Sequence, residues 1–251
     1  MPYNLQNFTL KDMAICSSWL RKAGKTAADM EEVANSMVGY FYDQFLVSGS
    51  DRKACALVRF FITHSYGKLN RDRRVIVQTV LGRDPKDENL QCLTLLATAG
   101  EKAEWNSVRR STGHQAIPLT SHAMVEQAPM ISQLIQQLGL DTGLVLSPAP
   151  DLIMEAAQKT YNVFHVPEAQ GSPYIPAQAE FVIPNGIRSV LGFGGVLPSG
   201  SLFTIIVFSK VPISSETANL FKTLSVSVKA AVLPFEGGRV FSRDSHTMES
   251  S

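Results

Sequence analysis

The residues of this sequence that are able to carry chemistry are few and scattered. None of the five histidines forms a pair at the i, i+4 spacing of a zinc-binding helix, and no cysteine lies beside one of them. We therefore predict no structural metal. His165 lies in a stretch that alternates as a strand does, where a neutral imidazole is able to ligate haem iron. The alternative is a histidine at the rim of the core that is hydrogen-bonded to the backbone.

A second group of candidates lies in residues 101–119, where no periodicity holds. Structureless segments of this length are uncommon in compact domains and are often functional. Arg109 and His114, with Trp105 nearby in the sequence, are able to bind an anionic ligand together. The alternative is a loop that is packed by its own side chains.

Arg188 stands at the start of an otherwise apolar run. Burying a guanidinium without a partner is costly, so this charge needs a ligand anion, a set of carbonyls or an internal carboxylate, for which Glu168 and Glu180 are the candidates. Tyr161 and Tyr174 complete the set. The predicted ligand-binding residues are Trp105, Arg109, His114, Tyr161, His165, Tyr174 and Arg188.

Two other motifs are better explained by packing than by catalysis. Gly192-Phe193-Gly194-Gly195 lies inside a predicted strand, whereas a phosphate-binding loop needs its glycines before the N-terminus of a helix. We expect these glycines to form a bulge or to allow close packing. Cys55 and Cys92 fall in predicted strands and Cys16 on a predicted helix, where a buried, inert thiol is usual. We therefore predict no catalytic residue.

The composition limits the class of protein. The chain has 251 residues, 45% of them hydrophobic, so it is able to bury a sizeable core. Its formal net charge of +1 without long basic runs argues against nucleic acid as a partner. The N-terminus lacks the pattern of a signal peptide, and the apolar runs are too short to cross a membrane. Three widely spaced cysteines favour a reducing compartment, so we expect a cytoplasmic protein.

Hydrophobic periodicity predicts an alternation of helices and strands. Two apolar runs joined by the Pro198-Ser199-Gly200-Ser201 turn predict a hairpin inside a sheet. An amphipathic helix follows, capped by Ser214 or Ser215 and ended by Pro234. Pro129 is expected to kink or split the helix in which it lies. Further strands are expected at residues 53–63, 91–100 and 161–166, and further helices at 9–22, 71–81 and 121–138, with one more that begins at Thr26 or Asp29 and runs to residue 45.

The order Gly186-Ile187-Arg188-Ser189, tight hairpin and closing amphipathic helix resembles the C-terminal half of a GAF domain, over about residues 160–233. More narrowly, it is similar to N-terminal input regions of bacterial multi-domain sensor histidine kinases. The resemblance implies an α/β fold with a central antiparallel sheet of five or six strands. Helices cover one face, a long irregular excursion over residues 101–180 covers the other, and segment 168–180 closes over a ligand pocket.

The sequence thus predicts one GAF-like domain over residues 1–235, with N-terminal helices in 1–50, the sheet, excursion and closing helix in 51–235, and a disordered tail at 236–251. We expect a non-catalytic domain of a bacterial two-component system that binds a small ligand or relays a signal. A homodimer is expected because the stripe from Met30 to Phe45 and the terminal helix offer apolar faces. A histidine kinase or another output protein is the expected partner. The alternatives are an enzyme with the 101–119 loop in its pocket, and a ligandless protein-interaction module.

Overall fold

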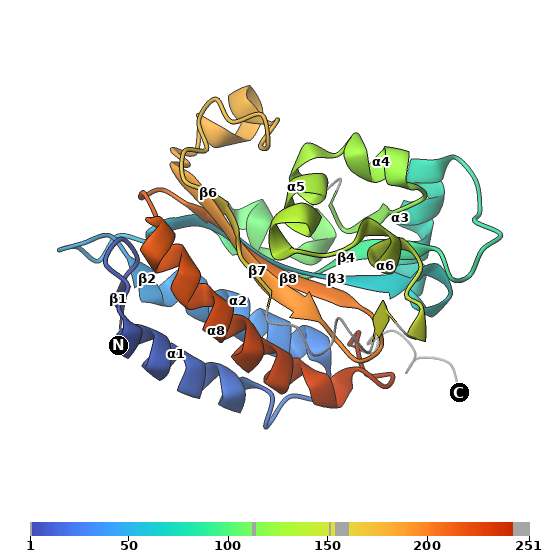
Figure 1. The fold of residues 1–251 in the computed structure, drawn as a ribbon, viewed down its shortest axis with the longest axis horizontal. Helices are drawn as coiled ribbons and strands as arrows, with labels where there is room; N and C mark the ends of the chain where they lie inside the picture. Colours follow the sequence, from blue (N-terminus) through green and yellow to red (C-terminus); the bar gives the residue numbers. More distant parts are fainter. Residues whose placement is uncertain (1, 112–113, 151, 154–160, 243–251) are drawn as a thin grey trace.

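One antiparallel sheet organises the chain (Figure 1). The computed structural model describes residues 2–111, 114–150, 152–153 and 161–242. The sheet has six strands in the order β5-β4-β3-β8-β7-β6, within the expected five or six. Their bounds are β3 (Cys55–Ser65), β4 (Gln91–Gly100), β5 (Ala116–Pro118), β6 (Phe164–Val166), β7 (Ser189–Val196) and β8 (Leu202–Ser209). A separate parallel pair joins β1 (Tyr3–Asn4) to β2 (Phe45–Leu46).

The predicted hairpin is confirmed as β7 and β8, and it lies inside the sheet. β8 is flanked by β3 and β7, and every residue of β7 and β8 is buried. Gly200 closes the turn with a φ of 86°, a conformation that glycine adopts without steric cost. Burial on both faces explains why these two strands read as nearly continuous apolar runs.

Three helices form a layer below the sheet in Figure 1. α2 (Met30–Gln44) and α8 (Ser215–Val232) pack on the strands, and α1 (Leu10–Ala23) packs against α8. Each helix begins at an expected capping residue. Thr9 and Asp12 form a reciprocal capping box at α1, and the side chains of Asp29 and Ser214 accept backbone N–H groups at α2 and α8.

The apolar stripe of α2 is buried within its own chain. The side chains of its stripe lie in the core between the helices and the sheet and are at most 1% exposed: Met30, Val33, Ala34, Met37, Val38 and Phe41. The stripe of α8 enters the same core. The apolar faces that suggested a homodimer are therefore covered within the chain, between the helices and the sheet.

The excursion covers the other face of the sheet, as expected. α3 (Arg71–Leu81) follows β3, and the region after β4 holds the 3₁₀ turns η2 (Ala103–Asn106) and η3 (Val108–Arg110) together with β5, a strand that the sequence did not reveal. Pro129 splits the expected helix into α4 and α5, as predicted. The remaining elements are α4 (His122–Glu126), α5 (Pro129–Leu138), α6 (Thr142–Leu146), the π-helix η4 (Gln178–Val182), and the short turns η1 (Tyr66–Lys68) and η5 (Leu233–Phe235).

The expected disordered tail begins later than position 236. The backbone carbonyls of Arg239 and Val240 accept the N–H groups of Met30 and Glu31 at the start of α2, and Val240 is 5% exposed. The first turn of a helix has free N–H donors, and this segment satisfies two of them. Residues 236–242 are thus part of the fold, while residues 243–251 lie outside the described part of the chain.

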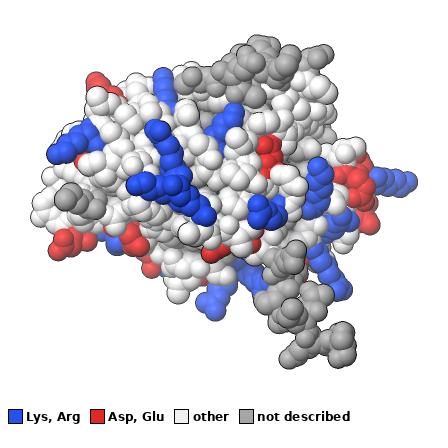
Figure 2. Space-filling view, turned by 90° about the horizontal axis from the view of Figure 1, so that it is seen from below, with Lys and Arg blue, Asp and Glu red and all other residues white. Residues whose placement is uncertain are grey.

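The surface carries charges of both signs. On the face seen from below the sheet, lysine and arginine side chains lie over the middle and the edges, acidic side chains lie mostly nearer the edges, and broad uncharged areas separate them (Figure 2). Among the described helices, none has the length and hydropathy that crossing a bilayer requires.

Candidate functional site

Two irregular segments that are far apart in the sequence meet over the sheet. Trp105 of η2 contacts Phe181 of η4 edge-on, with 5.6 Å between ring centroids, and Phe181 contacts Phe208 of β8 at 5.0 Å. The Thr98 hydroxyl in β4 donates to the Trp105 carbonyl at 2.8 Å. The loop after β4 and the segment before β7 are therefore joined at one place, on the face of the sheet that the excursion covers.

The segment over residues 169–183 is held together by one amide side chain. The Gln178 amide nitrogen donates to the carbonyls of Ala169 at 2.9 Å and Ile175 at 2.6 Å, and its oxygen accepts the Gly171 N–H at 2.9 Å. The segment is fastened to the sheet where the Ala169 N–H donates to the Arg188 carbonyl. It thus forms a small cap whose own bonds hold its shape, and π-helical turns such as η4 are frequent at functional sites.

We expect Gln178→Ala to loosen this cap. The substitution leaves partly buried backbone groups without their partner, which is expected to lower the free energy of unfolding by about 1–3 kcal/mol. Urea denaturation measures the loss, and hydrogen exchange is expected to accelerate at residues 169–183. Gln170→Ala, at an exposed position of the same segment, is the control and is expected to leave both measurements unchanged.

Beside this aromatic contact, strand β3 carries a charged side chain, that of Arg59, which faces the interior. Leu57 and Phe61 of β3 belong to the core on the excursion side, while Val58 and Phe60 belong to the core on the helix side. Side chains alternate along a strand, so Arg59 faces the excursion. Its cross-strand neighbours are Thr98 in β4 and Ile206 in β8.

The Arg59 guanidinium lies in this interior without a partner. The residue is 8% exposed, and its Nε atom is fully buried and makes no hydrogen bond. Within the described residues no carboxylate forms an ion pair with Arg59. Burial lowers the pKa of the guanidinium to about 10, so the group is still charged at neutral pH. Removing an unpaired charge from water is costly, and a bound anion is one way in which that cost is offset.

The structure places Arg188 differently from the expectation. Its backbone N–H donates to the Ser209 carbonyl, but its side chain is exposed just before β7 begins. The prediction that this charge is buried and needs a partner was therefore wrong. Neither Glu168 nor Glu180, both exposed, forms an ion pair with it in the described part of the chain. An apolar neighbourhood in sequence did not mean burial here, because the strand starts one residue later.

The other sequence candidates do not converge on one place. Trp105 lies at the aromatic contact, whereas Arg109 is exposed and lies 3.8 Å from the Asp72 carboxylate. His114 is exposed, and Tyr174 is 39% exposed on the cap. Tyr161 is 7% exposed in the core of the excursion side, where burial raises its pKa to about 12. Among these candidates, only Trp105 lies near Arg59, because its carbonyl accepts from Thr98, the cross-strand neighbour of Arg59.

The His165 side chain is hydrogen-bonded to the backbone. Its Nε2 atom lies 3.0 Å from the Ile213 carbonyl, and its own N–H donates to the Gln137 side chain. Burial lowers the pKa of His165, and the bond to the carbonyl opposes this effect. The alternative from the sequence, a histidine bonded to the backbone, is confirmed. Ligation of haem iron through Nε2 requires this bond to break.

The thiols and the metal-ligating side chains offer little for catalysis. Cys16, Cys55 and Cys92 are all buried, and burial raises the pKa of the Cys16 and Cys92 thiols to about 12 and that of Cys55 as well. A thiol must ionise to act as a nucleophile, so these three are protonated at neutral pH. The described residues contain no group of three or more His, Cys, Asp or Glu side chains placed to hold a metal ion.

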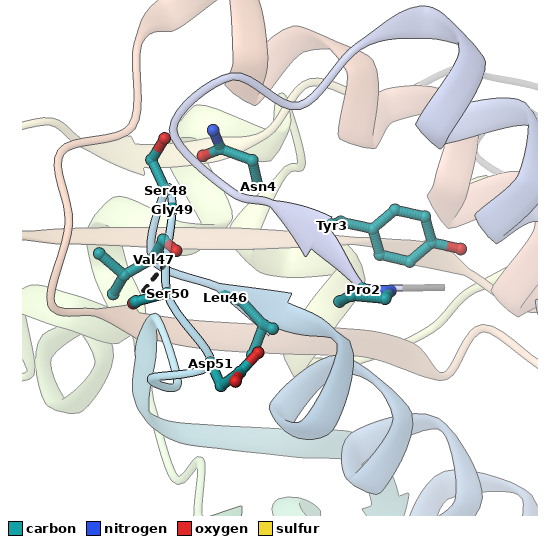
Figure 3. A pocket seen from close by; sticks show the side chains of 9 residues that line it. All are labelled: Pro2, Tyr3, Asn4, Leu46, Val47, Ser48, Gly49, Ser50 and Asp51. Carbon is teal, nitrogen blue, oxygen red and sulfur yellow. Dashed lines mark hydrogen bonds between the residues drawn. The ribbon is translucent and has the colours of Figure 1, made fainter.

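A surface depression of about 310 Å³ lies between β1 and the turn after β2 (Figure 3). None of the sequence candidates lines it, and the Asn4 side chain there accepts the N–H groups of Gln6 and Asn7. Its charged side chain is that of the exposed Asp51. We do not assign this depression a function. The lining residues are Pro2, Tyr3, Asn4, Leu46, Val47, Ser48, Gly49, Ser50 and Asp51.

Sequence reasoning missed Arg59, Phe181 and Phe208. For Arg59 a signal was present, since it is a lone charge in the middle of the apolar run from Ala54 to Ile62. A charged residue with five apolar residues on one side and three on the other is either on an open face of the sheet or buried for a reason. The aromatic residues carry no comparable signal, because their meeting depends on how the cap folds back.

No protein-family model matches the sequence, and neither does any sequence among the curated proteins. Several solved structures resemble the fold. The reduced form of fRMsr from Staphylococcus aureus has 8% identity and a TM-score of 0.47, covering 88% of this chain and 95% of that one. The free methionine-R-sulfoxide reductase of Neisseria meningitidis has 10% identity and a TM-score of 0.44, covering 88% and 90%. The GAF domain of an Acinetobacter phosphoenolpyruvate-protein phosphotransferase has 11% identity and a TM-score of 0.45, covering 89% and 94%. At these values no activity or ligand passes from those proteins to this chain.

Proposed function

We propose that this chain is a non-catalytic domain that binds a small ligand between the sheet and the excursion. The observation that carries the proposal is the contact of Trp105 with Phe181 over Phe208, where two irregular segments meet on the sheet. Ligand sites are commonly apolar and aromatic with a few polar groups. Arg59 supplies a polar group on β3, the strand next to that of Phe208, and Thr98 lies across from it on β4, where its hydroxyl donates to the Trp105 carbonyl.

The chemistry of this place supports binding rather than turnover. An arginine is charged across the physiological range and is a poor general base. The Thr98 hydroxyl already donates to a backbone carbonyl. The buried thiols belong to other positions, with Cys16 and Cys55 in the core on the helix side of the sheet. The groups that face the excursion are thus suited to hold a molecule in place.

We further propose that binding is relayed through the sheet to the C-terminal helix. Ile206 faces the excursion, while its neighbours Ile205 and Val207 on β8 pack in the core that contains α8. A shift of β8 therefore reaches α8 by direct packing, because close-packed cores transmit displacement. A cytoplasmic role in bacterial two-component signalling, with a homodimer and a histidine kinase or other output protein as partner, belongs to this proposal.

The fluorescence emission of Trp105 tests whether a ligand binds at this place. Trp19 stacks on Tyr40 in the helix layer, with 3.7 Å between ring centroids, so Trp19→Phe leaves Trp105 as the single tryptophan. The Trp19→Phe protein is incubated with the low-mass fraction of a bacterial extract and then examined by native mass spectrometry and by tryptophan emission. We expect a bound small molecule together with a shift of the Trp105 emission.

Two results would contradict the proposal. A protein that retains no small molecule favours the ligandless interaction module. A bound molecule that leaves the Trp105 emission unchanged places the site elsewhere on the chain. The same treatment of the Trp105→Phe protein, which keeps Trp19, is the control and is expected to show no emission change on binding.

A further inference from the structure

We infer that the ligand is a small organic monocarboxylate whose charged end binds to Arg59. This inference rests on the proposed function and adds the chemical class of the ligand. It starts from Arg59, which is more than nine-tenths buried, faces the excursion, has a fully buried Nε atom without a hydrogen bond, and forms no ion pair in the described part of the chain. A buried cation of this kind favours an anion as its counterpart.

The count of charges favours a single negative charge. Arg59 and Arg73 are the buried charged residues of the described chain, and Arg73 is already paired with Glu31 at 3.0 Å. One unpaired positive charge therefore remains in the interior. A monoanion neutralises it, whereas a dianionic phosphate would bring a second negative charge without a partner into the same low-dielectric surroundings.

The shape of the donor favours a carboxylate. A guanidinium presents a planar fork of N–H groups that matches the two oxygens of a carboxylate, and one edge of this fork includes Nε. In Arg59, as in Arg73, this Nε–H is fully buried and has no acceptor, but Arg59 also lacks the carboxylate partner that Arg73 has in Glu31. The Thr98 hydroxyl beside it donates to the Trp105 carbonyl and keeps its own oxygen as an acceptor.

The neighbouring side chains favour an apolar body for the molecule. Leu57 and Phe61 flank Arg59 on the same face of β3, and Ile206 lies across from it on β8. All three are at most 5% exposed. A short aliphatic or aromatic acid thus has a charged end for Arg59 and an apolar remainder for these side chains.

The test compares acids with their uncharged amides. Benzoate and 4-methylpentanoate are titrated against the full chain by calorimetry, beside benzamide, 4-methylpentanamide and inorganic phosphate. We expect at least one acid to bind about 10- to 100-fold more tightly than its amide, the range expected for losing a charge-assisted hydrogen bond. Phosphate is expected not to compete.

Variants of Arg59 assign the effect to this side chain. We expect Arg59→Met to abolish the preference for acid over amide, and Arg59→Lys to retain less than a tenth of the affinity because an ammonium lacks the planar fork. Arg83→Met, which removes an exposed charge, is the control and is expected to bind as the unaltered chain does. Circular dichroism checks that each variant is folded.

Equal affinity for acid and amide, no binding of either acid, competition by phosphate, or an unchanged preference in Arg59→Met would each overturn the inference. These results are separable from failure of the proposed function. If a neutral molecule from the extract binds and shifts the Trp105 emission, the proposed ligand-binding function is supported and only the inference of a monocarboxylate ligand is contradicted.

Discussion

Arg73→Met is expected to lower the free energy of unfolding by about 3–5 kcal/mol, the usual cost of removing one partner from a buried ion pair. The Arg73 guanidinium donates to the Glu31 carboxylate at 3.0 Å and to the Leu95 carbonyl at 3.2 Å. The Phe241 ring packs over it at 4.4 Å. The substitution leaves the Glu31 carboxylate, whose side chain is 17% exposed, without its cation. Urea denaturation of the full chain measures the loss.

Arg59→Met is the matched comparison, and we expect the opposite sign. Both arginines are buried on or beside the sheet, at 8% and 6% exposure, but Arg59 has no ion pair or hydrogen bond within the described residues. An apolar side chain of similar length removes the cost of an unpaired charge, so stability is expected to rise by about 2 kcal/mol. A loss of stability in Arg59→Met as large as that in Arg73→Met would show that Arg59 has a structural partner.

The two outcomes together separate a structural charge from a functional one. Most core substitutions destabilise a protein, so a stabilising change at a buried polar residue indicates that the residue is kept for another reason. The expected loss of acid binding in the same Arg59→Met protein connects that reason to the ligand. Stability and binding are therefore expected to change in opposite directions at this position.

The sequence predicted most of the architecture because its local signals agree with the packing. Capping residues such as Thr9 and Ser214 lie where α1 and α8 begin, and Pro129 splits a helix as its missing N–H requires. The apolar runs predict a hairpin inside the sheet, and every residue of β7 and β8 is buried. In these elements the secondary structure that the local sequence favours is the one that the tertiary packing requires.

The site was less predictable because its residues meet only through the tertiary fold. Trp105 and Phe181 come from segments far apart in the sequence and contact each other on one face of the sheet. The three-residue strand β5 forms only by pairing with β4 at the edge of the sheet. Neither feature has a local period. Arg188 shows the reverse error, since its apolar sequence neighbours are buried and its own side chain is exposed. The tail prediction failed at residues 239–240 because their backbone carbonyls accept N–H groups at the N-terminus of α2 and the Val240 side chain is buried.

Gly194→Ala is expected to lower the free energy of unfolding by about 3 kcal/mol, at the upper end of the usual cost of overpacking. A Cβ atom at this position would lie 2.0 Å from the Phe203 carbonyl oxygen and 2.8 Å from the Thr204 Cα, both backbone atoms of β8. Backbone in a central strand is unable to move aside as a flexible side chain does. The prediction that the strand glycines serve close packing is thereby confirmed at Gly194.

The effect should extend to the helix layer. Phe193, next to Gly194, packs edge-on against Phe221 of α8 at 5.1 Å and Phe41 of α2 at 5.6 Å, so a displaced β7 disturbs the core between sheet and helices. Thermal and urea denaturation measure the loss. The control is Gly39→Ala in α2, where a Cβ atom meets nothing within 4 Å and where alanine is favoured over glycine by about 0.5–1 kcal/mol. If Gly194→Ala proves as stable as the unaltered chain, β7 and β8 are able to separate at little cost. The relay from the sheet to α8 would then lack the stiffness it needs, because a strand that yields at Gly194 absorbs a displacement instead of passing it to Phe221.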